Sequence, residues 1–257
     1  MLKAEGLARS FGGVYALSGI SMSVSDGELR GVIGPNGAGK STLFYLISGH
    51  LSADRGTIAY RGQRIDRLAP HDRARLRISI VFQAARLFLG MTVLENVMVG
   101  AHVWSRHGFF EAALRLPRRS REEREIRRRA EEAIERVGMG AWAGTRAESL
   151  PLGQQRSLQL ARALCGEPRL LLLDEPASGL RAGERDALAA LLGQLKADGL
   201  TMMLIEHDVG FVSGLADVVT VLDLGRVIAE GPPDRIRRDP AVIAAYIGKE
   251  TGHAPHH

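Results

Sequence analysis

The 257-residue sequence predicts an α/β fold in which a helical insertion interrupts a sheet-and-helix core. Short apolar runs of core-strand length occur at 29–33, 78–82, 170–173 and 201–205. The last two are continuous apolar runs, which is typical of parallel strands buried on both faces. Between 86 and 149 the sequence becomes helical and charged. This order of elements is typical of an α/β core that carries a helical lobe.

The remaining elements are expected from local signals. Three further short strands are expected, at 2–10, 20–24 and 57–60, with turns between or after them. A helix is expected over Lys40–Ser48, ended by Gly49 at the C′ position. Two short apolar runs, 218–222 and 227–229, predict a closing hairpin, and a last helix is expected near Asp239–Gly248.

The composition is ordinary for a soluble globular protein, with 45% hydrophobic and 25% charged residues. Aromatic residues make up only 5%, which argues against a base-stacking nucleic-acid surface. No apolar run approaches the ~18–20 residues that span a bilayer, and the N-terminal residues lack the apolar stretch of a signal peptide. The single cysteine, Cys165, excludes a disulfide within the chain. These observations predict residence in the cytosol.

A phosphate-binding loop is the strongest single motif. It reads Gly34-Pro35-Asn36-Gly37-Ala38-Gly39-Lys40-Ser41-Thr42, between an apolar strand and a helix, and matches G-x-x-x-x-G-K-[ST]. Glycines let the backbone wrap around phosphates, and a helix N-terminus adds partial positive charge. Lys40 is expected to reach the β- and γ-phosphates, and the Ser41 hydroxyl to ligate Mg²⁺. The loop alone leaves kinases, GTPases and ATPases open.

Two carboxylates at the end of a buried strand favour hydrolysis. Asp174 and Glu175 follow Leu170–Leu173, at the edge of a parallel sheet where ligands bind. Asp174 suits a second contact to Mg²⁺, and Glu175 is placed to accept a proton from an attacking water. His207 follows the next buried strand, where it could hydrogen-bond the γ-phosphate. A neighbouring base for water favours an ATPase over a kinase.

The net charge of +5 comes mainly from residues 118–129, which contain seven arginines and three glutamates. We expect a solvated helix with three i, i+4 ion pairs, Glu123–Arg127, Glu125–Arg129 and Glu132–Arg136. Contact with anionic lipid or with an acidic partner is the alternative. No nucleic-acid binding is expected. Three tail histidines, His253, His256 and His257, are expected to be solvated.

Five motifs in order give the sequence a specific resemblance to the ABC ATPases over nearly the whole chain. They are the loop Gly34–Thr42, Gln83 after a strand, LPLGQQR at Leu150–Arg156, LLLLDE at Leu170–Glu175, and His207. The resemblance implies a single ABC ATPase domain over 1–248, followed by a disordered tail at 249–257. It implies a RecA-like P-loop core and an antiparallel β subdomain from 1–83 and 150–248, with an inserted α-helical subdomain at 84–149.

The resemblance also implies roles for further residues, and ATP and Mg²⁺ as cofactors. Phe11 should stack on adenine, and Gln83 should sense Mg²⁺ and link the site to the helical subdomain. Gly153 and Gln154 open a helix whose N–H groups, in the family, cap the γ-phosphate bound by an opposite subunit. ATP would then lie between two subunits of a homo- or heterodimer, with hydrolysis reopening the dimer.

Two departures from the family pattern leave the equality of the two ATP sites open. The usual signature LSGGQ here has Pro151 and Leu152 in place of serine and the first glycine. The loop after Glu175 usually reads S-G-L-D, and here Ser178-Gly179-Leu180 is followed by Arg181. Pro151 is compatible with a helix start, so the amide contacts from Gly153 are expected to survive.

Several stretches are similar to the ATP-binding subunits of branched-chain amino-acid importers. They include RLFLGMTVLENVMVGAH at Arg86–His102, GQQRSLQLARAL at Gly153–Leu164 and DPAVIAAYIG at Asp239–Gly248. This implies two membrane permease subunits, a second ATPase subunit and, indirectly, a solute-binding protein, with the chain peripheral on the cytoplasmic face of the plasma membrane. Residues 83–97 would contact the permeases. Exporters of envelope lipid, importers of urea or amides and, more remotely, non-transport ATPases are the alternatives.

Overall fold

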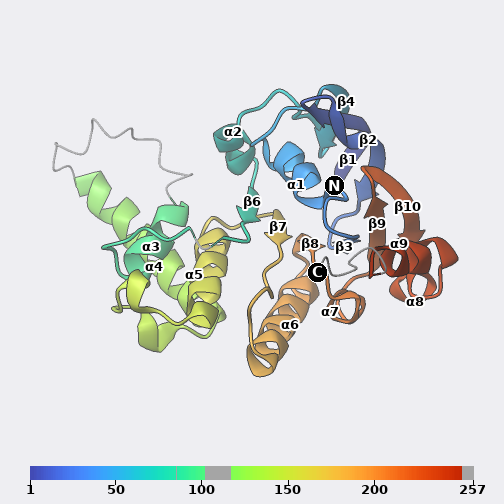
Figure 1. Cartoon of the computed structure of the whole chain (residues 1–257). Helices are drawn as coiled ribbons and strands as arrows, with labels where there is room; N and C mark the ends of the chain where they lie inside the picture. Colours follow the sequence, from blue (N-terminus) through green and yellow to red (C-terminus); the bar gives the residue numbers. More distant parts are fainter. Residues whose placement is uncertain (85, 102–116, 251–257) are drawn as a thin grey trace.

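The computed structural model describes residues 1–84, 86–101 and 117–250. The three tail histidines lie outside the described residues, as do residues 85 and 102–116. Figure 1 shows two sheets and a separate group of helices. An antiparallel sheet has the order β2-β1-β4-β5. Its strands are β1 (Leu2–Phe11), β2 (Val14–Val24), β4 (Arg55–Tyr60) and β5 (Gln63–Arg64).

The larger sheet has the order β10-β9-β3-β8-β7-β6. All of its neighbouring strands pair in parallel except β10, which runs antiparallel to β9. The strands are β3 (Leu29–Ile33), β6 (Ile78–Val81), β7 (Leu170–Asp174), β8 (Thr201–Ile205), β9 (Val218–Asp223) and β10 (Arg226–Gly231). The predicted parallel core strands and the closing hairpin are confirmed.

Both faces of this sheet are covered, which explains the continuous apolar runs. Alternate residues of a strand point to opposite faces. Leu171 and Leu173 accordingly join one core cluster, packed with the large helices, while Leu170 and Leu172 join the other. The second cluster lies with α1 and the antiparallel sheet. All five residues of β7 are buried.

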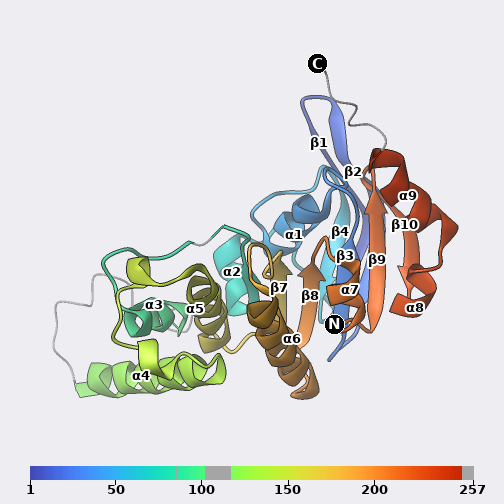
Figure 2. The ribbon, with the colours of Figure 1, turned by 60° about the horizontal axis from the view of Figure 1, so that its bottom comes forward.

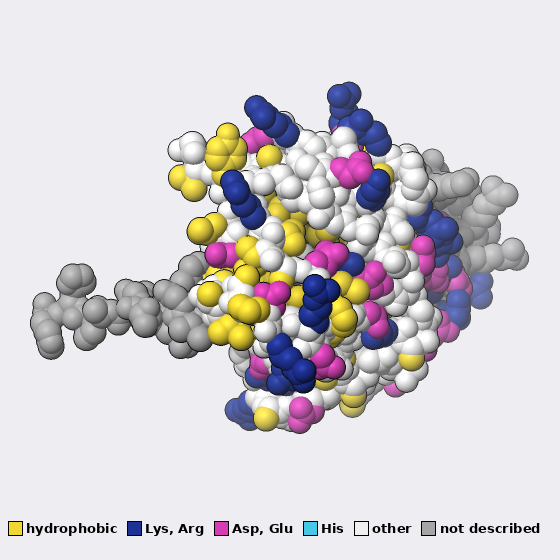
Figure 3. Space-filling model, turned by 90° about the vertical axis from the view of Figure 1, so that its right-hand side faces the viewer, with side chains coloured by type: hydrophobic (Ala, Val, Ile, Leu, Met, Phe, Trp, Pro, Cys, Tyr) yellow, Lys and Arg dark blue, Asp and Glu magenta, His cyan; other side chains and the backbone are white. Residues whose placement is uncertain are grey.

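Helices flank the sheets (Figures 1 and 2). They are α1 (Lys40–Ser48), α2 (Pro70–Arg75), α6 (Ala182–Ala197), α7 (Val209–Ser213), α8 (Pro233–Ile236) and α9 (Pro240–Glu250). The predicted first helix is confirmed at both ends, and Gly49 follows it with a φ of 85°. On the face that carries β10, α8 and α9, acidic and basic side chains are interspersed (Figure 3).

A separate helical group contains α3 (Val93–Ala101), α4 (Pro117–Arg136) and α5 (Leu152–Cys165), with short 3₁₀ turns at Gly140–Trp142 and Ala147–Ser149. The helix α5 packs on α3 and α4, so the group extends past the sequence-based boundary at 149. Helices α3 and α5 cross closely at Gly100, where a Cβ would lie 2.0 Å from the Arg162 carbonyl oxygen. Among the described helices, none combines the length and the apolar character that a membrane span requires.

Of the three ion pairs expected on α4, one forms among the described residues. Glu125 Oε1 lies 2.8 Å from Arg129 Nε. The other expected partners pair with different neighbours: Arg127 with Glu131, Glu132 with Arg128, and Arg136 with Asp198. Because residues three and four apart are both neighbours on a helix, each arginine has several partners of similar energy. A regular spacing therefore predicts pairing but not the partner.

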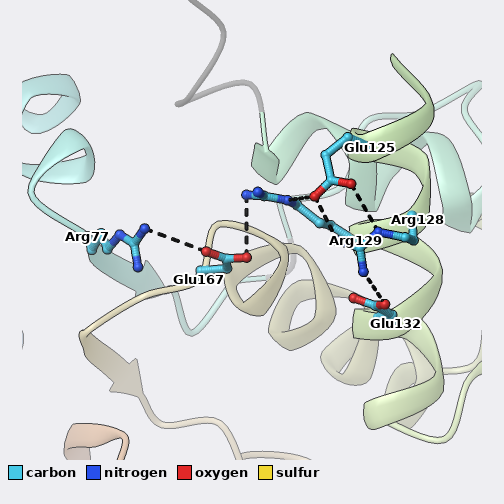
Figure 4. A network of polar contacts seen from close by, with 6 residues as sticks. All are labelled: Arg77, Glu125, Arg128, Arg129, Glu132 and Glu167. Carbon is cyan, nitrogen blue, oxygen red and sulfur yellow. Dashed lines mark hydrogen bonds and ion pairs between the residues drawn. The ribbon is translucent and has the colours of Figure 1, made fainter. Parts of the chain in front are cut away.

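Arg129 also extends this network beyond α4 (Figure 4). Its Nη1 lies 3.4 Å from Glu167 Oε1, and Glu167 Oε2 lies 3.6 Å from Arg77 Nη2. Glu167 follows α5, and Arg77 precedes β6. The network thus joins the helical group to the edge of the larger sheet.

A buried arginine holds the end of α1. Arg73 of α2 is 2% exposed, and the hydrogen bonds that its guanidinium makes within the described residues all go to backbone carbonyls. The acceptors are Leu46, Ile47, Asp66 and Leu68, at 2.5, 2.8, 3.2 and 3.0 Å. The last carbonyls of a helix have no partner within it. Arg73 therefore satisfies carbonyls at the end of the helix that follows the phosphate loop.

Replacing Arg73 with methionine is expected to lower the free energy of unfolding by about 2–4 kcal/mol, because buried carbonyls lose their donors. Urea unfolding measures this change. The control is Arg75→Met on the same helix, whose side chain is 67% exposed and which should change stability by at most ~0.5 kcal/mol. Equal stability of the two variants would show that the buried hydrogen bonds contribute little.

Candidate functional site

The predicted site residues meet at one edge of the larger sheet. In the order β3-β8-β7-β6, each of these parallel strands leads at its carboxyl end into a predicted site residue. The phosphate loop follows β3, His207 follows β8, Asp174 ends β7, and Gln83 follows β6. Ligands of open α/β sheets bind at this edge. The strand order therefore brings together residues that lie far apart in the sequence.

The phosphate loop is shaped by two glycines that have no room for a side chain. A Cβ on Gly34 would lie 2.1 Å from the Leu222 carbonyl oxygen, and one on Gly39 would lie 2.4 Å from that of Ala16. Gly39 has a φ of 100°, and Gly37 has a φ of 80°. Glycine adopts this left-handed region without steric cost. The loop therefore packs between β2 and β9 and leads directly into α1.

Lys40 and Ser41 are the first two residues of α1. The Lys40 side chain is hydrogen-bonded to the phosphate loop, and the Ser41 side chain is hydrogen-bonded to β7. Lys40 is buried, and its Nζ donates to the carbonyl oxygens of Gly34 and Pro35, at 2.7 and 3.1 Å. Ser41 Oγ donates to Asp174 Oδ1 at 3.4 Å. The first turn of α1 has no side-chain cap. A helix N-terminus that directly follows a glycine-rich loop is a typical place for a phosphate to bind.

Asp174 is almost completely buried, with 1% exposure. Burial, and then the neighbouring charge of Glu175, raises the pKa of Asp174 to about 6. A buried carboxylate is costly unless a cation or hydrogen bonds compensate it. Mg²⁺ prefers oxygen ligands, and the Ser41 hydroxyl and the Asp174 carboxylate lie side by side. These two residues therefore fit a magnesium site beside the phosphate loop.

Glu175 lies between two polar side chains from neighbouring strands. Its Oε2 accepts a hydrogen bond from Gln83 Nε2 at 2.5 Å, and its Oε1 contacts His207 Nε2. Glu175 is buried and has a φ of 48°, which is uncommon for a residue other than glycine. Its N–H donates to the Ile205 carbonyl at 3.0 Å. The Gln83 side-chain amide is therefore hydrogen-bonded to Glu175. Among the described residues, no hydrogen bond joins that amide to Ser41 or Asp174.

Three predicted site residues lie on other parts of the chain. Phe11 ends β1, is exposed and has the Arg9 guanidinium 4.9 Å from its ring centroid. Gly153 and Gln154 lie in the first turn of α5, within the helical group. A Cβ on Gly153 would lie 2.3 Å from Glu184 Oε1, next to the start of α6. The described fold therefore brings the predicted residues at the sheet edge together, but it does not bring these three residues to that edge.

Two residues near the site received no role from the sequence motifs, although Arg156 is the last residue of LPLGQQR. Arg156 of α5 donates from Nη1 to the Gln83 carbonyl oxygen, and Glu206 accepts from the Ala177 N–H at 2.8 Å. Glu206 is buried. A charged residue directly after the apolar strand 201–205 is the signal that could have identified it.

Comparison with known proteins decides the family. A family model described as "ABC transporter" matches residues 17–178. The chain belongs to the ABC transporter family. A second model, "Branched-chain amino acid ATP-binding cassette transporter", matches residues 226–251. The predicted ABC ATPase fold and the ATP-hydrolysing activity are confirmed by this membership.

Curated relatives match over nearly their whole length. The high-affinity branched-chain amino acid transport ATP-binding proteins BraF of Pseudomonas aeruginosa and LivG of Escherichia coli are each 38% identical over 250 residues, covering 97% of this chain and 98% of the relative. The lipopolysaccharide export system ATP-binding protein LptB of Haemophilus influenzae is 30% identical, with the same coverage.

Solved structures agree with this fold. A nucleotide-free ATP-binding cassette of an ABC transporter has a TM-score of 0.84 at 30% identity, covering 96% of this chain and 99% of that chain. The ADP conformation of such a cassette has a TM-score of 0.82 at 30% identity, covering 96% and 98%. A dimeric bacterial ABC transporter cassette has a TM-score of 0.78 at 25% identity, covering 91% and 99%.

Asp174→Asn is expected to raise stability above pH 6 in the absence of nucleotide. The folded state binds the Asp174 proton more tightly than the unfolded state, since the pKa rises from 3.8 to about 6. The parent therefore loses stability as the pH rises from about 4 to about 6. Thermal unfolding across and above this pH range measures the loss of stability. The loss should be smaller in Asp174→Asn, because asparagine does not titrate. If the stability of the parent and of Asp174→Asn depended equally on pH, the prediction would be contradicted.

Proposed function

We propose that this chain is the ATPase subunit of an importer for branched-chain amino acids. The observation that carries the proposal is the match of residues 226–251, which include β10 and α9, to a model described for that group of transporters. Identity to BraF and LivG, 38%, exceeds identity to the exporter protein LptB, 30%, over the same share of the chain. Import is therefore favoured over export.

The site supports a specific division of roles in hydrolysis. Gly34–Thr42 and the start of α1 would hold the ATP phosphates, and Lys40 would contact the β- and γ-phosphates. Ser41 and Asp174 would hold Mg²⁺, which neutralises charge that develops on the phosphates. Glu175 accepts the proton of the attacking water, while His207 and Gln83 hold its carboxylate in place. The contacts of Glu175 with both side chains support this assignment.

The working unit would be a dimer. Gly153 and Gln154 begin α5 in the helical group, and their N–H groups would contact the γ-phosphate bound by a second ATPase subunit. A similar cassette is dimeric in a solved structure. Phe11, exposed at the end of β1, would stack on adenine. ATP would close this dimer, and hydrolysis would reopen it.

Two permease subunits would dock on the helical group. Phe88, Leu89 and Met91 are all exposed, within the predicted contact region 83–97. Exposed apolar side chains that lie together are typical of protein–protein contact surfaces. This docking would place the chain at the cytoplasmic face of the membrane, with a solute-binding protein acting on the opposite side.

Purification with partners from native membranes tests the proposal. The chain is extracted in mild detergent with ATP, and the co-purifying proteins are identified. Two permeases and a second ATPase are expected, and the complex in proteoliposomes should accumulate labelled leucine, isoleucine or valine when ATP is supplied. Uptake of urea or amides, or lipid export, would replace the proposed substrate. Recovery with ribosomal or DNA-associated proteins would contradict transport.

A further inference from the structure

Three consecutive residues after β8 hold the segment that follows β7. Glu206 accepts from the Ala177 N–H, His207 contacts the Glu175 carboxylate, and Asp208 pairs with Arg185 of α6. β7 and β8 are neighbours in the sheet. Glu206 and His207 therefore attach the segment that carries Glu175 to the residues after β8, and Asp208 attaches the following helix α6.

Glu206 is the most buried of these three residues, with 4% exposure. Its Oε1 lies 2.8 Å from the Ala177 nitrogen. A buried carboxylate costs free energy unless it is hydrogen-bonded, and an apolar residue here would remove the acceptor of the Ala177 N–H. The Ala177 N–H that donates to the Glu206 carboxylate therefore gives a reason for a carboxylate at this buried position.

The segment from Glu175 to Leu180 consists of tight turns. The Ser178 N–H donates to the Glu175 carbonyl and the Leu180 N–H to the Ala177 carbonyl, each at 3.2 Å. Glu175 itself has a left-handed φ of 48°. Such a conformation persists only where surrounding contacts determine it. The hydrogen bond from Ala177 to Glu206 supplies one of these contacts, close in the chain to the Glu175 carboxylate.

We propose that Glu206 is a positioning residue for ATP hydrolysis, which acts by holding the Ala177 N–H and thereby fixing the Glu175 carboxylate between Gln83 and His207. The inference rests on the proposed role of Glu175 as the base. Among the described residues, Glu206 forms no hydrogen bond with Gln83 or with the phosphate loop. Its effect should therefore fall on kcat and not on the binding of ATP.

The test compares Glu206→Leu, Glu206→Gln and Glu175→Gln in the full-length chain. Phosphate release gives kcat and KM for ATP. Glu206→Leu should lower kcat by about 10²-fold, the cost of a misplaced catalytic group, with KM changed less than about twofold. Glu206→Gln keeps an acceptor oxygen and should recover kcat to within about fivefold of the parent. The matched control is Glu131→Leu on α4, an exposed position that should leave both constants unchanged.

The outcomes separate the two proposals. If Glu175→Gln loses activity and Glu206→Leu keeps the parental kcat, the positioning role is wrong while the role of Glu175 stands. If Glu175→Gln is fully active, the proposed base itself is wrong. Should Glu206→Leu fail to fold, amide hydrogen exchange of Ala177 decides: protection in the parent and in Glu206→Gln supports the inference, and unprotected exchange in the parent overturns it.

Discussion

Replacing Glu175 with glutamine is expected to lower kcat for ATP hydrolysis by about 10²–10⁴-fold. Glutamine keeps the size of the side chain but cannot accept the proton of the attacking water. The carboxylate contacts Gln83 and His207, so it is held by groups from both neighbouring strands. Phosphate release measures the loss, and size-exclusion chromatography with ATP should show that nucleotide-bound dimers persist.

The matched control for this change is Glu5→Gln on β1, whose side chain is exposed. It should hydrolyse ATP at the parental rate. Parental activity of Glu175→Gln would instead require another base, and His207 would be the next residue to replace.

Replacing Lys40 with alanine is expected to lower kcat/KM for ATP by at least about 10²–10³-fold, because a preorganised donor to the transferring phosphate is lost. Lys40 is buried and donates to the Gly34 and Pro35 carbonyls, so it also holds the loop in shape. Titration with a fluorescent ATP analogue and phosphate release measure binding and turnover separately.

The control for Lys40→Ala is Lys3→Ala, whose side chain is exposed on β1. Thermal unfolding of both variants shows whether the loop change alters the fold. Unchanged nucleotide affinity and turnover in folded Lys40→Ala would contradict the assignment of the phosphate loop.

Local chemistry explains what could be predicted from the sequence. The phosphate loop requires glycines at fixed positions and a helix start directly after them, so residues close in sequence define it. The helix Lys40–Ser48 ends at Gly49 because glycine adopts the left-handed conformation there. The apolar runs 170–173 and 201–205 indicate strands covered on both faces. Each of these features depends on near neighbours in the chain.

The tertiary structure alone decided which distant residues meet. The order β3-β8-β7-β6 brings Gln83 and His207 to either side of Glu175. Arg136 leaves its expected partner on α4 for Asp198, because a helix offers several partners of similar energy and the fold supplies another. Glu206 likewise acquires its partner, Ala177, only when β7 and β8 lie side by side. Sequence determines local geometry, whereas long-range pairing depends on strand order and on competition between partners, and these are settled by packing of the whole chain.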